Sequence, residues 1–292
     1  MSICGKCLFS LAVITAVPAL CAQSIKTADV TFTTIDVPGA VLTSVQGINS
    51  AREMVGYYGP SSGPYHGFIL SGSNVISFDY PSAISTLGEK INDSGLIVGY
   101  ADNGGSENGF TYDGITFNAV QHGQDSATVC LGIDNLGDIV GGAGTPGATR
   151  GFELRGTRFR RIAPSGNFVY VYATDINSLG EVVGWTASGL NAEGFANKRG
   201  KFQTLAVSGA AQTEAWGIND AGIVVGWYQV GSNVYGFALM NGTYISLQYP
   251  GAKATFAEGI NTSGEIVGSY TFDYNTYHGF ITSPISFVNI EQ

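Results

Sequence analysis

The stretch that decides the fold is AWGINDAGIVVGWYQVGSNVYGFALMNGTYISLQY, residues 215–249. Its core phrase is Ile-Asn-x-x-Gly-x-Ile-Val-Gly, followed about ten residues later by Gly-Phe, and it occurs six times with small variations. The copies begin at isoleucines that are 42 or 43 residues apart, at Ile48, Ile91, Ile133, Ile176, Ile218 and Ile260. A period of this length, rich in short apolar runs, indicates one supersecondary unit stacked on copies of itself.

Each copy is predicted to contain four short strands. In the quoted copy these strands cover residues 215–219, 223–228, 235–239 and 244–249. Asp220-Ala221-Gly222 forms the first turn, and Asn241-Gly242 is a strong tight-turn signal. No window keeps an apolar period of 3.6 residues, so no helix is expected.

Four antiparallel strands in about 42 residues, repeated six times, predict an all-β fold, a six-bladed β-propeller of four-stranded blades. Residues 23–292 would form this single domain. Six phenylalanines occupy one equivalent position and are interpreted as wedges between neighbouring sheets: Phe68, Phe110, Phe152, Phe195, Phe237 and Phe280. The alternative architecture is an open β-solenoid.

The turns of the repeat have a mechanical explanation. Glycine ends the first turn in five copies, as at Gly222, where a left-handed backbone is required. The asparagine three residues earlier can bond the turn backbone through its side chain. The first copy has Arg52 at the glycine position, so its turn should be strained or differently shaped.

The two ends of the chain carry separate signals. Residues 1–22 combine Lys6, a thirteen-residue apolar stretch from Leu8 to Leu20 and small residues, which is the layout of a secretory signal peptide. We therefore expect a secreted or periplasmic protein without a membrane span. Residues 30–40 match a fourth strand with its exit turn and are predicted to complete the last blade. Residues 285–290 also read as a fourth strand and compete for that position.

Composition excludes several classes of partner and of site. The formal net charge is −9, so a nucleic-acid or anionic-membrane partner is not expected. Cys130 is the one cysteine outside the signal peptide and is interpreted as a buried, inert thiol. A monomer is expected.

Motifs of known catalytic machinery are missing, including Gly-x-Ser-x-Gly, His-Glu-x-x-His and the phosphate-binding Gly-x-x-x-x-Gly-Lys-[Ser/Thr]. No catalytic residue, cofactor or metal is predicted. His66 and His278 occupy equivalent positions in the first and last blades, but packed sheets lie about 10 Å apart and zinc needs ligands at about 2.1 Å. Structural histidines bonded to nearby loops are the preferred interpretation.

Aromatic residues that follow the Val-Gly element give the first hint of function. The candidate ligand-binding residues are Tyr57, Tyr100, Trp185, Trp227 and Tyr270. All of them are expected near the loops between second and third strands, on one face of the disc. Flat rings beside small polar residues suit sugars or peptide chains. The alternative is that a recurring aromatic packs against the next blade.

The inner strand gives a second hint. Six equivalent positions are expected to face the axis: Gln46, Glu89, Leu131, Thr174, Trp216 and Glu258. Alternation along a strand would place Gln46, Glu89 and Glu258 in one polar sector of an axial channel, because they lie on adjacent blades. This sector could hold only water, or it could bind a cation or another polar ligand.

The repeat resembles the HAF-type extracellular repeat of bacteria. His66-Gly67-Phe68 and His278-Gly279-Phe280 are the closest matches, and glycine stands in all six copies where the family has alanine. The resemblance covers about residues 30–290. It implies an exported bacterial protein and no established activity.

Two functional hypotheses follow. The first is a secreted, non-enzymatic binding or interaction module that presents loops to a glycan or protein at the cell surface. The alternative is an extracellular polysaccharide hydrolase or lyase that uses acidic residues near the propeller axis, namely Glu89 and Glu258.

Overall fold

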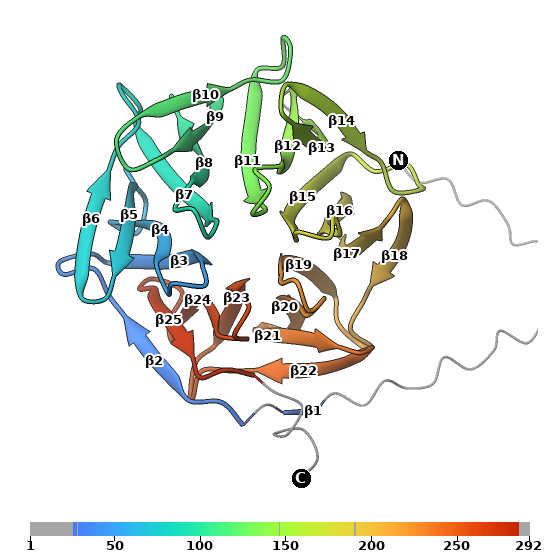
Figure 1. The fold of residues 1–292 in the computed structure, drawn as a ribbon. Coiled ribbons are helices and arrows are strands. Elements are labelled where there is room, and N and C mark those ends of the chain that lie inside the picture. The colour runs from blue at the N-terminus through green and yellow to red at the C-terminus, as the bar shows by residue number, and fades with distance from the viewer. Residues whose placement is uncertain (1–25, 28, 146, 190, 286–292) are drawn as a thin grey trace, which may run out of the picture.

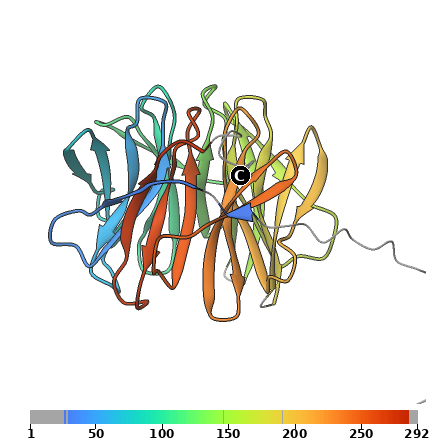
Figure 2. The same ribbon diagram turned by 90° about the horizontal axis from the view of Figure 1, so that it is seen from below.

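The computed structural model describes residues 26–27, 29–145, 147–189 and 191–285, and these residues form strands, turns and loops. Figure 1 shows the strands arranged in a ring around a central axis, and the side view in Figure 2 shows a disc rather than an elongated rod. The described residues therefore form a β-propeller and not the open β-solenoid. The predicted signal peptide, residues 1–22, lies outside the described residues.

Each repeat supplies an antiparallel sheet, here called a blade, whose first strand lies innermost (Figure 1). Blade 1 is built from β3 (Leu42–Ile48), β4 (Met54–Gly59), β5 (His66–Ser71) and β6 (Asn74–Phe78). Blade 2 follows with β7 (Ser85–Ile91), β8 (Ile97–Asp102), β9 (Glu107–Tyr112) and β10 (Phe117–Val120). Blade 3 contains β11 (Ala127–Ile133), β12 (Ile139–Thr145), β13 (Ala148–Arg155) and β14 (Arg158–Ile162).

Blades 4 and 5 keep the same order of strands. Blade 4 contains β15 (Tyr170–Ile176), β16 (Val182–Ser188), β17 (Asn191–Lys198) and β18 (Lys201–Leu205). Blade 5 contains β19 (Gln212–Ile218), β20 (Val224–Val230), β21 (Asn233–Met240) and β22 (Thr243–Leu247). The short β1 (Lys26–Thr27) adds to β22 in parallel.

The last blade, here called blade 6, joins the two ends of the chain. It contains β23 (Ala254–Ile260), β24 (Ile266–Thr271), β25 (His278–Thr282) and, as its outer strand, β2 (Phe32–Ile35). Phe32 lies opposite Thr282 in this antiparallel pair, which confirms the predicted position of residues 30–40. Of the competing segment only Ile285 is described, and its amide donates to the carbonyl of Gly264.

The core is a set of wedges between neighbouring blades. The six repeated phenylalanines are at most 3 % exposed. Each of them belongs to an apolar cluster that also contains the valine of the preceding blade's Val-Gly element, as Phe68 does with Val267 and Phe110 with Val55. Cys130 is buried in the cluster of Phe152, as predicted.

The repeated turns follow the predicted chemistry. In blade 5 the Oδ1 atom of Asn219 accepts hydrogen bonds from the amides of Ala221 and Ile223, and Gly222 has a φ of 75°. Arg52 keeps the same turn in blade 1 at a φ of 62°. The first turn is therefore strained rather than differently shaped.

Candidate functional site

The inner hairpin of every blade contains a β-bulge. The register between the first two strands shifts around one residue, which has no residue opposite it. The six bulge residues are Gln46, Glu89, Leu131, Thr174, Trp216 and Glu258. A bulge re-aims side chains and is common beside functional sites. These are the positions expected to face the axis, and all but Thr174 line the pocket described next.

One end of the axis opens into a pocket of about 460 Å³, here called the axial pocket. It lies at the end where second and third strands are connected. Its aromatic lining residues are Tyr57, Tyr65, Tyr100, Trp216, Trp227, Phe256 and Tyr277. Its polar lining residues are Ser44, Gln46, Ser61, Glu89, Glu258 and Ser269. A concave site with aromatic walls and a few polar groups is the usual form of a small-ligand site.

Two aromatic pairs stiffen the walls. The rings of Tyr57 and Tyr65 lie 5.5 Å apart, and the Tyr65 hydroxyl donates to the carbonyl of Ser61. Trp227 and Phe256 meet edge to face at 5.7 Å. Ring pairs of this geometry contribute about 0.5–1.5 kcal/mol beyond their buried area. The walls are therefore held in place by contacts within the protein.

The base of the axial pocket contains two buried carboxyl groups. Burial, together with the nearby Glu258 and against the attraction of Lys90, raises the pKa of Glu89 to about 8. Burial also raises the pKa of Glu258 to about 7, although Lys90 opposes this shift. The Oε2 atom of Glu258 is buried without a hydrogen-bond partner among the described residues. Both groups can therefore bind a proton near neutral pH.

Beside the axial pocket lies a second hollow of about 290 Å³, here called the side hollow. It shares Tyr65 and Tyr100 with the axial pocket and adds Asp102 and Glu107. Burial, and then the nearby Asp102, raises the pKa of Glu107. The two hollows are adjacent because they share two tyrosine side chains, so an extended ligand could occupy both.

Lys90 and Asp175 narrow the axis below the axial pocket. The Lys90 ammonium donates to the carbonyls of Gln46 and Glu258, at 3.0 Å each. Asp175 Oδ2 accepts from the amide of Ile218. Lys90 and Asp175 also line the pocket at the opposite end of the axis. They therefore form the layer between the two ends.

Sequence reasoning missed this layer, although a signal was present. The residue before each leading isoleucine is glycine in four copies, and Lys90 and Asp175 are the two exceptions. Glycine is required where neighbouring backbones approach closely. At Gly132, for example, an added Cβ would lie 2.6 Å from the Cα of Asp175. Lys90 and Asp175, which carry opposite charges, stand at a position that is glycine in the other four copies, and they mark the place where side chains fill the axis.

The structure brings together Tyr57, Tyr100 and Trp227 from the candidate aromatic residues, but not Tyr270. Tyr270 lies two residues after Gly268, whereas Trp227 immediately follows Gly226. Successive side chains of a strand point to opposite faces, so Ser269 takes the pocket position in blade 6. Tyr270 is buried and stacks on Tyr249 at 3.5 Å. The sequence prediction grouped Tyr270 with the other aromatics, and this was wrong because Tyr270 lies one residue beyond the pocket position and points to the opposite face of the strand.

Trp185 immediately follows the glycine of its Val-Gly element, as Trp227 does, but it is not among the residues that line the axial pocket. Tyr172 lies opposite it on β15, and the two rings are 4.6 Å apart. Tyr172 also fills the space beside Gly142, whose added Cβ would lie 2.6 Å from its ring. The aromatic of blade 4 is therefore used for packing. Thr174 also makes a structural contact, because its hydroxyl group donates a hydrogen bond to the carbonyl of Ala215 in the next blade.

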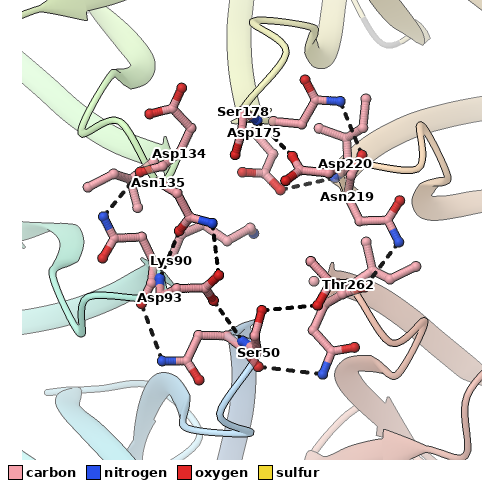
Figure 3. A pocket seen from close by; sticks show the side chains of 18 of the residues that line it. Ser50, Lys90, Asp93, Asp134, Asn135, Asp175, Ser178, Asn219, Asp220 and Thr262 are labelled. Atoms are coloured by element: carbon pink, nitrogen blue, oxygen red, sulfur yellow. Dashed lines mark hydrogen bonds between the residues drawn. The ribbon is translucent and has the colours of Figure 1, made fainter.

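The other end of the axis is closed by a ring of turn residues (Figure 3). Its hollow is about 70 Å³, which is room for a few water molecules. Asparagine side chains donate to the carbonyl of the corresponding residue in the next blade. The donors are Asn49, Asn92, Asn177, Asn219 and Asn261. Asp134 replaces the asparagine in blade 3, and its Oδ2 is buried without a partner among the described residues.

The histidines lie away from the axial pocket, at the outer strands. His66 Nδ1 is 2.8 Å from Asp79, and His278 Nδ1 is 3.0 Å from Asp36, the equivalent residue of the last blade. Both pairs join the third strand to the end of the fourth, which agrees with the structural interpretation. Within the described ranges, no three His, Cys, Asp or Glu side chains gather in a group that could hold a metal.

No protein-family model matches the chain, and no curated protein matches it. Solved structures match in fold. TolB from Acinetobacter baumannii has a TM-score of 0.55 at 12 % identity, over 85 % of this chain and 65 % of that chain. A gluconolactonase from Xanthomonas campestris has a TM-score of 0.51 at 12 % identity, over 90 % and 98 %.

A fungal lectin from Aleuria aurantia, described as a six-bladed β-propeller that recognises fucose, has a TM-score of 0.50 at 13 % identity, over 85 % and 93 %. Similarity at this identity shows the β-propeller fold alone. No helix long and apolar enough to cross a membrane occurs in the part of the chain that the structure describes.

Proposed function

We propose that this chain is a closed, six-bladed β-propeller that is exported and binds a glycan in the axial pocket without transforming it. The observation that carries the proposal is the pocket itself. Aromatic rings, including Tyr57 and Trp227, surround the polar groups of Gln46, Glu89 and Glu258. Sugar rings offer apolar faces for aromatic side chains and hydroxyl groups for such polar atoms.

Closure of the ring is supported by contacts between the first and last blades. The amide of Thr43 donates to the carbonyl of Tyr277, and the amide of Tyr277 donates to the carbonyl of Val41. Asn261 donates to the carbonyl of Asn49 at the opposite end of the axis. We also propose, from the resemblance of the repeat alone, that the protein is a HAF-type extracellular repeat protein that is secreted or periplasmic.

The test is a glycan array followed by binding measurements with the best ligand. Trp227→Ala should weaken binding at least tenfold, because it removes one wall of the axial pocket. Trp185→Ala is the matched control, since Trp185 packs on Tyr172 outside the pocket. Equal weakening by both variants, or an array without any bound glycan, would contradict the proposal.

A hydrolase or lyase remains the second candidate, because Glu89 and Glu258 lie in one pocket and both can carry protons near neutral pH. General acid–base chemistry on a glycan needs such carboxyl groups. A turnover screen on the glycans that bind separates the two candidates. Product formation that is lost in Glu258→Gln would replace binding by catalysis.

A further inference from the structure

The charged groups that line the two adjacent hollows have one sign. The axial pocket contributes Glu89 and Glu258, and the side hollow contributes Asp102 and Glu107. None of the described residues that line either hollow is Lys, Arg or His. A site of this composition disfavours anions and attracts cations.

One oxygen of these carboxyl groups lacks a partner within the described ranges. Glu258 is 7 % exposed and lines the axial pocket, and its buried Oε2 accepts no hydrogen bond from any described residue. Buried polar atoms are normally hydrogen-bonded, so such an oxygen needs an explanation. A ligand that donates a hydrogen bond at this point would supply one.

The protein's own cation does not neutralise the acids around it. Lys90 already donates to the carbonyls of Gln46 and Glu258, below the pocket. The carboxyl groups of Glu89, Glu258 and Asp175 all interact with its ammonium. Three carboxyl groups therefore share one ammonium, and an ammonium group of a ligand would stabilise their ionised forms.

Aromatic side chains add to the attraction. The faces of Trp and Tyr rings attract ammonium groups within about 6 Å. Tyr57 and Trp227 line the axial pocket together with the two glutamates, and Tyr65 and Tyr100 line both hollows. Rings and carboxylates together recognise a protonated amine better than a neutral hydroxyl group.

We propose that the ligand is a glycan with free, protonated amino groups, one of which pairs with Glu258 and Glu89 while another lies near Asp102 and Glu107. This inference rests on the proposed function and specifies its ligand class. The separation of the acids into two adjacent hollows suits a polymer of amino sugars, because successive units would each present an ammonium.

The test compares three sets of oligosaccharides by calorimetry at pH 6.5, where the amino groups carry protons: glucosamine oligomers, their fully N-acetylated counterparts, and glucose oligomers of the same linkage. The glucosamine oligomers should bind about 10- to 100-fold more tightly than the other two, as expected for a charged hydrogen bond. Glu258→Gln and Asp102→Asn should each remove most of this preference. Glu193→Gln, which changes an exposed residue of blade 4, should leave it intact.

Binding of the amine should also depend on pH. Glu89 interacts with Glu258, Lys90, Tyr57 and Tyr100. Glu258 interacts with Lys90, Tyr57 and Glu214 as well. Ionised carboxyl groups pair with an ammonium, so affinity should rise from pH 5 towards neutrality, where the ligand's amino groups begin to lose their protons, and the rise should shrink in Glu258→Gln. A flat profile in the unmodified protein would overturn the proposed ion pair.

The possible results distinguish this inference from the proposed function, glycan binding, on which it rests. Equal or tighter binding of the acetylated or neutral oligomers would overturn the amine proposal and leave glycan binding standing. No binding of any oligosaccharide would overturn both. A lysine-rich peptide that binds as tightly as the glucosamine oligomers, with the same loss in Glu258→Gln, would overturn the glycan as the ligand.

Discussion

The ammonium of Lys90 donates a 3.0 Å hydrogen bond to the backbone carbonyl of Glu258, a residue 168 positions later in the chain. A second bond of the same length reaches the carbonyl of Gln46, so one side chain of blade 2 joins blades 6 and 1 at the axis. Lys90 also acts on the two glutamates of the axial pocket, since its charge lowers the pKa of both against the effect of burial. It thus links the stability of the ring to the charge of the pocket.

Lys90→Met should destabilise the protein by about 2–4 kcal/mol, because two carbonyls lose a charged donor and three buried carboxyl groups lose the nearby positive charge. Urea unfolding at pH 7 measures this loss. Lys201→Met changes an exposed lysine of β18 and should alter stability by less than about 0.5 kcal/mol. Similar small effects from both variants would show that the axial bonds contribute little.

Stability should fall as pH rises from 5 to 9. Burial raises the pKa of Glu89 and Glu214 to about 8 and that of Glu258 to about 7, above the ordinary value of 4.5. Between these values the folded protein binds more protons than the unfolded chain, so the free energy of unfolding decreases with pH. The raised pKa of Glu89 alone corresponds to about 4 kcal/mol over this range, so we expect a decrease of at least about 4 kcal/mol, measured by urea unfolding from pH 5 to pH 9.

The same experiment has a variant that isolates the cause. Glu89→Gln removes one titrating group and should flatten the decrease, which makes this variant more stable than the unmodified protein at pH 9. Glu193→Gln should keep the original slope. If stability instead rises towards pH 9, the buried carboxyl groups are not the groups that determine it.

Arg52→Gly should stabilise the protein by about 0.5–1 kcal/mol. Arg52 has a φ of 62°, and a left-handed conformation costs a side-chain-bearing residue roughly 1–2 kcal/mol. The substitution also removes the ion pair between Arg52 and Glu265, which is 62 % exposed on the arginine side and contributes at most about 1 kcal/mol. Thermal unfolding measures the difference.

The reverse change supplies the control for the turn. Gly95 has a φ of 83° in the equivalent turn of blade 2, and an added Cβ there would meet nothing within 4 Å. Gly95→Ala should therefore lower stability by about 1 kcal/mol through backbone strain alone. A neutral Gly95→Ala would remove the basis for the gain expected from Arg52→Gly.

The repeat made much of the fold predictable from the sequence. The wedge Phe68 and the turn glycine Gly222 were predictable because they stand at positions that recur in the repeats. The outer strand within residues 30–40 was predictable because this segment resembles a fourth strand but precedes the first complete repeat. Their local chemistry requires the same residue in nearly every copy. The 42-residue period is therefore enough to predict the architecture. Arg52, which replaces the turn glycine in the first copy, adds strain to that turn without changing its shape.

The candidate site was only partly predictable, because it depends on register and on neighbours. Counting from the glycine of the Val-Gly element would have placed Ser269, and not Tyr270, in the axial pocket. No count would have shown that Tyr172 covers Trp185 in blade 4. The layer of Lys90 and Asp175 was overlooked because it occupies a position where the other copies have only glycine.

Asp134→Asn should complete the ring of asparagine side-chain hydrogen bonds at the end of the axis opposite the axial pocket. Five blades have an asparagine that donates to the next blade, whereas Asp134 has a buried oxygen without a partner in the described part of the chain. The amide introduced by the substitution would meet the carbonyl of Asn177, as the other copies meet theirs. We expect a gain of about 0.5–1.5 kcal/mol at pH 7, by urea unfolding.

The gain should depend on pH in a way that identifies its origin. Burial raises the pKa of Asp134, so at acidic pH the protonated carboxyl group can itself donate, and the advantage of asparagine should shrink. Asn92→Asp opens the ring at a second point and should lower stability by a similar amount at pH 7, because its bond to the carbonyl of Asp134 is lost. A gain from Asp134→Asn that is the same at pH 4 and pH 7 would point to relief of charge-independent strain instead of a new hydrogen bond.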